Sequence, residues 1–157
     1  MIMPSSPPPS EQARVFLIGD RPLCLHGMTQ IIGAQGDLSV CGTSATTQEA
    51  MSALPSSAAA AVVLDLSAAP AATADVVTAL HSALAQVPIL VVGAQTDAVQ
   101  ALRVLRAGAK GYVTKHDAVD DFVAAVRKVL GGQVYLSPRF SERLIAELAS
   151  SSQGELR

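Results

Sequence analysis

Three charged residues each stand at the end of a short apolar run, and their types are suited to phosphoryl chemistry. Asp20, Asp65 and Lys115 follow runs rich in valine, leucine and isoleucine. Carboxylate oxygens are ligands that Mg²⁺ prefers, and a lysine ammonium binds a phosphoryl oxygen as a point charge. The pattern therefore indicates a magnesium and phosphoryl site, provided that the fold brings the three side chains together.

The elements that would carry these residues alternate along the chain. Short runs rich in Val and Ile, bounded by Gly, Pro or Asp, favour strands over buried helices. Strict alternation with helical segments predicts a parallel sheet covered on both faces. The expected strands are 14–19, 38–41, 61–66, 88–93 and 111–113, and the expected helices are 22–33, 47–54, 73–85, 97–107 and 117–130.

Such a sheet gathers the ends of its strands at one edge. Ligands of doubly wound sheets bind in the crevice at the carboxyl ends of the strands. With the strand order 2-1-3-4-5, the first and third strands are neighbours, so Asp20 and Asp65 face the same space. The fifth strand brings Lys115 in from the other side. Asp20 and Asp117 are also suited to cap the helices that follow them.

Composition limits the class of protein. The chain has 157 residues, of which 50% are hydrophobic and 3% aromatic, so one domain with an aliphatic core is expected. A net charge of −2 gives no basic surface for nucleic acid. Cys24 and Cys41 lack the spacing of a zinc site or a disulfide framework. Neither a signal peptide nor an apolar stretch that could cross a bilayer is evident, so we expect a cytoplasmic protein without membrane contact.

Three regions are expected along the chain. Residues 1–13, rich in Pro and Ser, read as a disordered leader, and residues 14–132 as the folded domain. Residues 133–157 read as a linker helix and a flexible tail. An apolar stripe on that helix would pack on its own domain or pair with a second chain; both remain open. Its members are Phe140, Leu144, Ile145 and Leu148.

Five segments carry a family resemblance. They are VFLIGDRP at 15–22, VVLDL at 62–66, PILVV at 88–92, RAGAKGYVTK at 106–115 and GGQVYLSP at 131–138. Residues 14–138 resemble the receiver domain of bacterial two-component response regulators, most of all the NarL/FixJ subfamily. The resemblance implies a flavodoxin-like (CheY-like) α/β fold with a five-stranded parallel sheet, order 2-1-3-4-5, helices on both faces and a C-terminal linker helix.

The resemblance also implies a role for each residue of the pocket. Asp65 matches the phosphoryl-accepting aspartate, and Lys115 matches the lysine that contacts the phosphoryl group. Mg²⁺ would be held by Asp20, Asp65 and the backbone carbonyl of Ser67. Tyr112 matches the aromatic residue that changes rotamer on activation. The family is a class of signalling modules, so no enzyme with catalytic residues of its own is expected.

The chain departs from the family pattern at the pocket. Gly19 stands where the family has a second acid, which weakens the attraction for Mg²⁺. Gly93 replaces the usual Ser or Thr, and the lost hydroxyl removes a hydrogen bond worth ~1 kcal/mol or somewhat more. We therefore expect phosphorylation to be atypical or impaired. Arg21 adds a cation; it either pairs with Asp20 or Asp65 and partly replaces the metal, or points into solvent.

Several functions follow from these observations. The first is the receiver of a LuxR/NarL-type transcription regulator, served by a sensor histidine kinase and forming a homodimer. DNA binding would belong to a C-terminal domain absent from this chain, which is then either truncated at Arg157 or a stand-alone receiver; the Ser-rich tail favours truncation. The alternative is a phosphorylation-independent pseudo-receiver that mediates dimerisation or protein interaction.

Enzyme functions fit the sequence poorly. A haloacid-dehalogenase-type phosphatase needs a second acid two residues after Asp65, where this chain has Ser67. A dinucleotide enzyme needs a glycine-rich turn after the first strand, and Gly19-Asp20-Arg21-Pro22 does not supply one.

Overall fold

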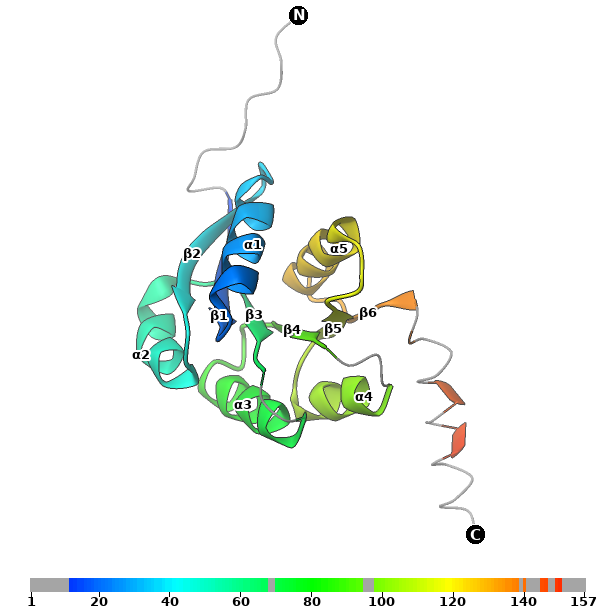
Figure 1. Cartoon of the computed structure of the whole chain (residues 1–157). Helices are drawn as coiled ribbons and strands as arrows, with labels where there is room; N and C mark the ends of the chain where they lie inside the picture. Colours follow the sequence, from blue (N-terminus) through cyan, green and yellow to red (C-terminus); the bar gives the residue numbers. More distant parts are fainter. Residues whose placement is uncertain are drawn as a thin grey trace, which may run out of the picture.

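Strands and helices alternate along the chain (Figure 1). The structure, a computed structural model, describes residues 12–67, 70–94, 98–138, 140, 145–146 and 149–150. In chain order the elements are β1 (Ala13–Gly19), α1 (Pro22–Gly33), β2 (Leu38–Ser44), α2 (Thr47–Ser57), β3 (Ala61–Asp65), α3 (Pro70–Ala83), β4 (Ile89–Gly93), α4 (Ala98–Ala107), β5 (Gly111–Thr114), α5 (Val119–Leu130) and β6 (Tyr135–Leu136).

The strands form one parallel sheet with the order β2-β1-β3-β4-β5-β6. The predicted order 2-1-3-4-5 is therefore confirmed, and a sixth strand extends the sheet beyond β5. This strand was not predicted, because Tyr135–Leu136 is too short to show a strand pattern in the sequence. It pairs Gly111 with Tyr135, and Tyr112 with Leu136.

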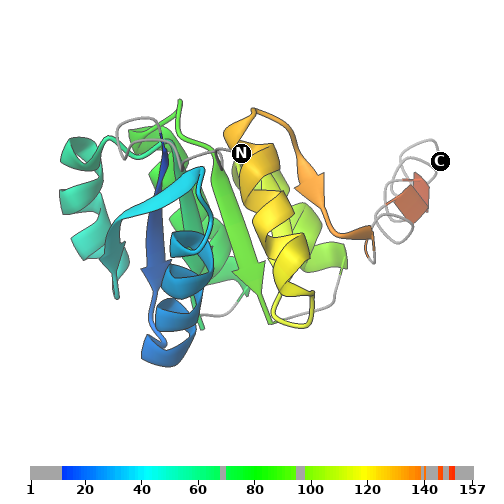
Figure 2. The ribbon, with the colours of Figure 1, turned by 90° about the horizontal axis from the view of Figure 1, so that it is seen from above.

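Helices cover both faces of the sheet, as Figures 1 and 2 show. The helices α1 and α5 lie on one face, and α2, α3 and α4 lie on the other. Side chains of β1 alternate between the two layers: Val15 and Leu17 belong to the core under α1 and α5, whereas Phe16 and Ile18 belong to the opposite core. Burial on both faces is why the strand reads as a continuous apolar run.

The two ends of the chain need separate description. Of the leader predicted for residues 1–13, all but the last two positions lie outside the described residues, and Ala13 begins β1. In the predicted linker stripe, Leu144 and Leu148 also lie outside them. Phe140 is fully buried against its own domain, whereas the side chain of Ile145 is 67% exposed. None of the helices in the described part has the length and apolar character needed to cross a bilayer.

Candidate functional site

The carboxyl ends of the strands meet at one edge of the sheet. Gly19 is the register partner of Asp65 across β1 and β3, and Gly93 is the partner of Thr114 across β4 and β5. Asp20 and Lys115 directly follow two of these positions. The edge therefore carries the residues that the sequence predicted for a phosphoryl site.

Asp65 and Lys115 form an ion pair. Lys115 Nζ lies 3.0 Å from Asp65 Oδ1, and the side chains are 22% and 2% exposed. Among the described residues, no further hydrogen-bond partner is found for Lys115 Nζ or for Asp65 Oδ1, so each charge depends on the other. The backbone N–H of Lys115 donates to the carbonyl of Gly93 at 3.0 Å, which fixes the lysine beside the strand ends. Removing either charge would leave the other buried and unpaired, which is strongly unfavourable.

Asp20 is bound to the loop after β3. Both carboxylate oxygens accept from the Ser67 N–H at 3.1 Å, and Oδ2 also accepts from the Ser67 hydroxyl at 2.7 Å. Desolvation raises the pKa of Asp20, but the hydrogen bonds from Ser67 and the charge of Arg21 outweigh it, so the pKa lies below its ordinary value. The carboxylate is thus held ionised near Asp65.

The capping role that the sequence predicted for Asp20 is wrong. Arg21 is the N-cap of α1, and no side chain caps its amides. The Asp20 carboxylate instead accepts hydrogen bonds from the hydroxyl and the N–H of Ser67, which both face it from the loop after β3. The N-cap of α5 is likewise Ala118, not Asp117, again without a side-chain cap.

The oxygen donors of this edge are suited to Mg²⁺ but are few. Two carboxylates, a backbone carbonyl and water make an acceptable donor set for this hard cation. The described residues contain no group of three or more His, Cys, Asp or Glu side chains able to hold a metal. Gly19 contributes no carboxylate to this edge, and a Cβ there would lie 3.3 Å from Leu25 Cδ1, a distance that a small shift of the leucine side chain would relieve. A bound cation would also compete with Ser67 for Asp20 and with Lys115 for Asp65.

Tyr112 fills the space beside Gly93. Tyr112 is fully buried, and a Cβ built on Gly93 would lie 2.6 Å from Tyr112 Cζ and closer still to its hydroxyl. On its other side the ring meets Phe140 edge-on, with ring centroids 5.6 Å apart and an interplanar angle of 69°. The absence of a side chain at position 93 is thus what lets the tyrosine lie in this buried position.

Arg21 does not replace a metal in this arrangement. Among the described residues, the ion pairs join Lys115 to Asp65 and Arg127 to Asp37. Arg21 is exposed and forms neither of the ion pairs that the sequence allowed. Its charge still lowers the pKa of Asp20. The direct partner of Asp65 is Lys115.

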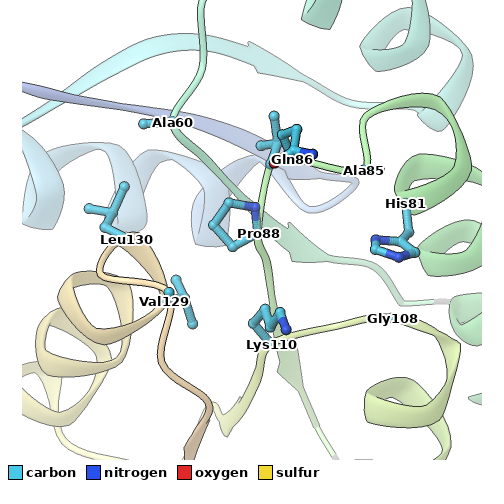
Figure 3. A pocket seen from close by; sticks show the side chains of 11 residues that line it. Ala60, His81, Ala85, Gln86, Pro88, Gly108, Lys110, Val129 and Leu130 are labelled. Carbon is cyan, nitrogen blue, oxygen red and sulfur yellow. The ribbon is translucent and has the colours of Figure 1, made fainter.

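Two cavities differ in their relation to this edge. One of about 230 Å³ lies between α1 and α5 and is lined by Cys24, Met28 and Phe122 together with Asp65 and Lys115. The other, of about 290 Å³, lies at the amino ends of the strands; Figure 3 shows it between Leu130 and His81. The larger cavity is therefore separated from the acidic residues by the length of the sheet.

Sequence reasoning missed the residues that hold the loop after β5. Asp117 accepts from the Thr114 N–H at 2.8 Å and from the Ser137 hydroxyl at 3.2 Å. Asp117 was predicted as a helix cap, and Ser137 only as part of the linker region 133–157. An Asp three residues after a strand-end Thr is compatible with either role, so no signal in the sequence separated them.

Comparison with known proteins assigns the family. The response regulator receiver domain matches residues 15–127, more than half of the chain. Oxygen regulatory protein NreC of Staphylococcus carnosus is 26% identical over 140 residues, covering 88% of this chain and 64% of NreC. Transcriptional regulatory protein UhpA of Salmonella typhimurium is 29% identical over 132 residues, covering 84% and 66%. The chain thus spans less than two thirds of the length of these relatives.

A solved structure agrees with this assignment. The crystal structure of a LuxR-family two-component response regulator from Aurantimonas sp. SI85-9A1 superposes with a TM-score of 0.80 at 25% identity, covering 88% of this chain and 99% of that one. Fold, strand-end residues and relatives lead to the same result. The chain belongs to the response regulator receiver domain family and is a receiver domain of the LuxR/NarL type.

Proposed function

We propose that this receiver is the signal-input domain of a bacterial transcription regulator and that Asp65 accepts a phosphoryl group inefficiently. The observation that carries the proposal is the ion pair between Asp65 and Lys115 at the carboxyl ends of the strands. It places a nucleophilic carboxylate beside the cation that a transferred phosphoryl group needs.

The chain's own residues account for the transfer step. An Asp65 carboxylate oxygen attacks the phosphorus of the donor, the new O–P bond forms, and the bond to the leaving group breaks with its electron pair going to that group. Lys115 Nζ then turns from the carboxylate to a phosphoryl oxygen, which keeps its charge paired. Asp20, Asp65 and the Ser67 carbonyl would hold Mg²⁺, which offsets the negative charge that gathers during transfer.

Two features make this transfer slow. Gly19 leaves one carboxylate fewer for the metal, and both Asp20 oxygens are already bonded to Ser67. Gly93 offers no hydroxyl to the phosphoryl group. Loss of one such hydrogen bond to a charged group costs about 1.5–3 kcal/mol.

A phosphorylation-independent pseudo-receiver is the second candidate, and Tyr112 favours it. Tyr112 is buried beside Gly93 while Asp65 is paired with Lys115, so its position does not depend on a phosphoryl group. In this case the domain would dimerise or dock constitutively.

The partners follow from the family. A sensor histidine kinase would supply the phosphoryl group, which places the domain in the cytoplasm, and a homodimer would be the working unit. DNA would be bound by a further domain and not by these residues, whose net charge of −2 offers no basic surface.

Intact-mass measurement separates the two candidates. The protein and its Asp65→Asn variant would be incubated with acetyl phosphate and Mg²⁺, alongside a receiver that is known to be phosphorylated. We expect the wild type to gain one phosphoryl group partially and slowly, and Asp65→Asn to gain none. A wild type that stays unmodified while the reference receiver is phosphorylated would reject the first candidate in favour of the pseudo-receiver.

A further inference from the structure

The segment that follows α5 is attached to the domain at three successive points. Tyr135 joins the sheet through its N–H, which donates to the Lys110 carbonyl at 2.9 Å. Ser137 is 3% exposed and donates to Asp117, and Phe140 is fully buried against Tyr112. Burial of a serine and a phenylalanine indicates a docked segment and not a loose connection.

Two of these attachments reach the neighbours of the acidic pocket. Asp117 also accepts from the Thr114 N–H, and its own N–H donates to the Thr114 carbonyl at 3.1 Å. Lys115, the partner of Asp65, lies inside this tight turn. A movement of Lys115 that shifts its backbone therefore acts on the hydrogen bonds that orient Asp117, and with them on the contact to Ser137.

The third attachment depends on Gly93. The Tyr112 ring is confined between Gly93 on one side and Phe140 on the other. Because Tyr112 also pairs in register with Leu136 of β6, backbone and ring hold the same segment. Because the two rings pack edge-on in the core, a change in the position of Tyr112 alters the surface against which Phe140 packs.

We propose that residues 135–138 together with Phe140 act as a transmission segment, docked through Ser137 on Asp117 and through Phe140 on Tyr112. This segment carries the state of the Asp65–Lys115 pair to the chain beyond residue 140. The coupling is reciprocal: loosening the segment also loosens the turn that holds Lys115. It operates whether a phosphoryl group or another change displaces Lys115, so it does not require phosphorylation of Asp65.

Hydrogen exchange on the full chain tests this coupling in both directions. Lys115→Met removes the charge at the pocket, and exchange is followed at the Tyr135 and Phe140 amides. Phe140→Ala and Ser137→Ala loosen the segment, and exchange is followed at Tyr112–Thr114. Ile145→Ala, at an exposed position, is the matched control. The amide of Leu17, in the middle of β1, corrects each variant for global unfolding.

The expected result is an increase in exchange of about tenfold or more at the distant site, relative to Leu17, for Lys115→Met and for at least one of the two segment variants. Ile145→Ala leaves both sites as in the wild type. The proposal is overturned if Lys115→Met leaves the Phe140 amide as protected as in the control. It is equally overturned if both segment variants speed exchange only within 135–140. Neither outcome bears on phosphoryl transfer, which the mass measurement reports.

Discussion

Adding one methyl group at Gly93 should disturb the protein out of proportion to its size. In Gly93→Ala the new Cβ would lie 2.6 Å from Tyr112 Cζ and 2.8 Å from Cε2. Both distances are far below the 3.5–4.0 Å of a favourable carbon contact. The ring must therefore leave its buried position, or the strands must separate locally.

The size of the effect follows from the buried surroundings. Overpacking a well-filled core costs about 1–3 kcal/mol, and Phe140 packs against Tyr112 on its other side. We expect Gly93→Ala to lower the free energy of unfolding by about 2 kcal/mol. Gly27→Ala is the control, because a Cβ there meets nothing within 4 Å; it should stabilise α1 by about 0.5–1 kcal/mol.

A double-mutant cycle assigns the cost to the tyrosine. Urea unfolding would be measured for Gly93→Ala, Tyr112→Ala and the combination. Once the ring is removed, the added methyl group has nothing to overlap, so Gly93→Ala should cost close to nothing in the Tyr112→Ala background. If it costs as much there as in the wild type, the clash with Tyr112 is not the cause and the reasoning is refuted.

Three further predictions concern the charged residues. Lys115→Met should lower the free energy of unfolding by about 3 kcal/mol in urea at pH 7, at the low end for a buried pair because Lys115 is partly exposed. Adding Asp65→Asn should restore most of this stability, and no restoration would contradict the ion pair. Gly19→Asp should tighten Mg²⁺ binding by about tenfold in calorimetric titration, with a small shift of the Leu25 side chain. An unchanged affinity would mean that the missing acid does not limit Mg²⁺ binding. Arg127 lowers the pKa of Asp37, so the stability it contributes is present above the ordinary value of 3.8 and is lost as pH falls through the lowered pKa. Arg127→Gln should therefore lower the free energy of unfolding by about 0.5–1 kcal/mol at neutral pH, since both side chains are about half exposed. The difference in stability between wild type and variant should shrink as the pH of the measurement falls toward about 2.5. A difference that stays constant with pH would contradict this dependence.

The parts of the fold that depend on local pattern were predictable. The run Ala61–Leu64 is apolar at every position, so a buried parallel strand ending at Asp65 follows from burial on both faces. The same logic placed Lys115 at the end of β5. The alternation with helices predicted a parallel sheet, and in a parallel sheet the residues at the strand ends lie at one edge.

The parts that depend on packing between distant residues were not. Gly93 was recognised as a missing hydroxyl, but its contact with Tyr112 joins two strands and leaves no pattern in either. The short β6 is stabilised by pairing with β5 and not by its own sequence. The choice of Asp117 between capping α5 and binding Ser137 was likewise decided by a residue 20 positions away.

The environment of Tyr112 tests the central claim most directly, namely that this receiver keeps Tyr112 buried without a phosphoryl group. The chain has only two tyrosines, Tyr112 and Tyr135, so aromatic NMR of tyrosine-labelled protein gives two assignable sets of signals. We predict that in the unphosphorylated protein the Tyr112 ring is packed and flips slowly, and that Phe140→Ala shifts its NMR signals. Signals of a mobile, solvent-averaged Tyr112 ring, ordered only after acetyl phosphate and Mg²⁺ are added, would contradict the account.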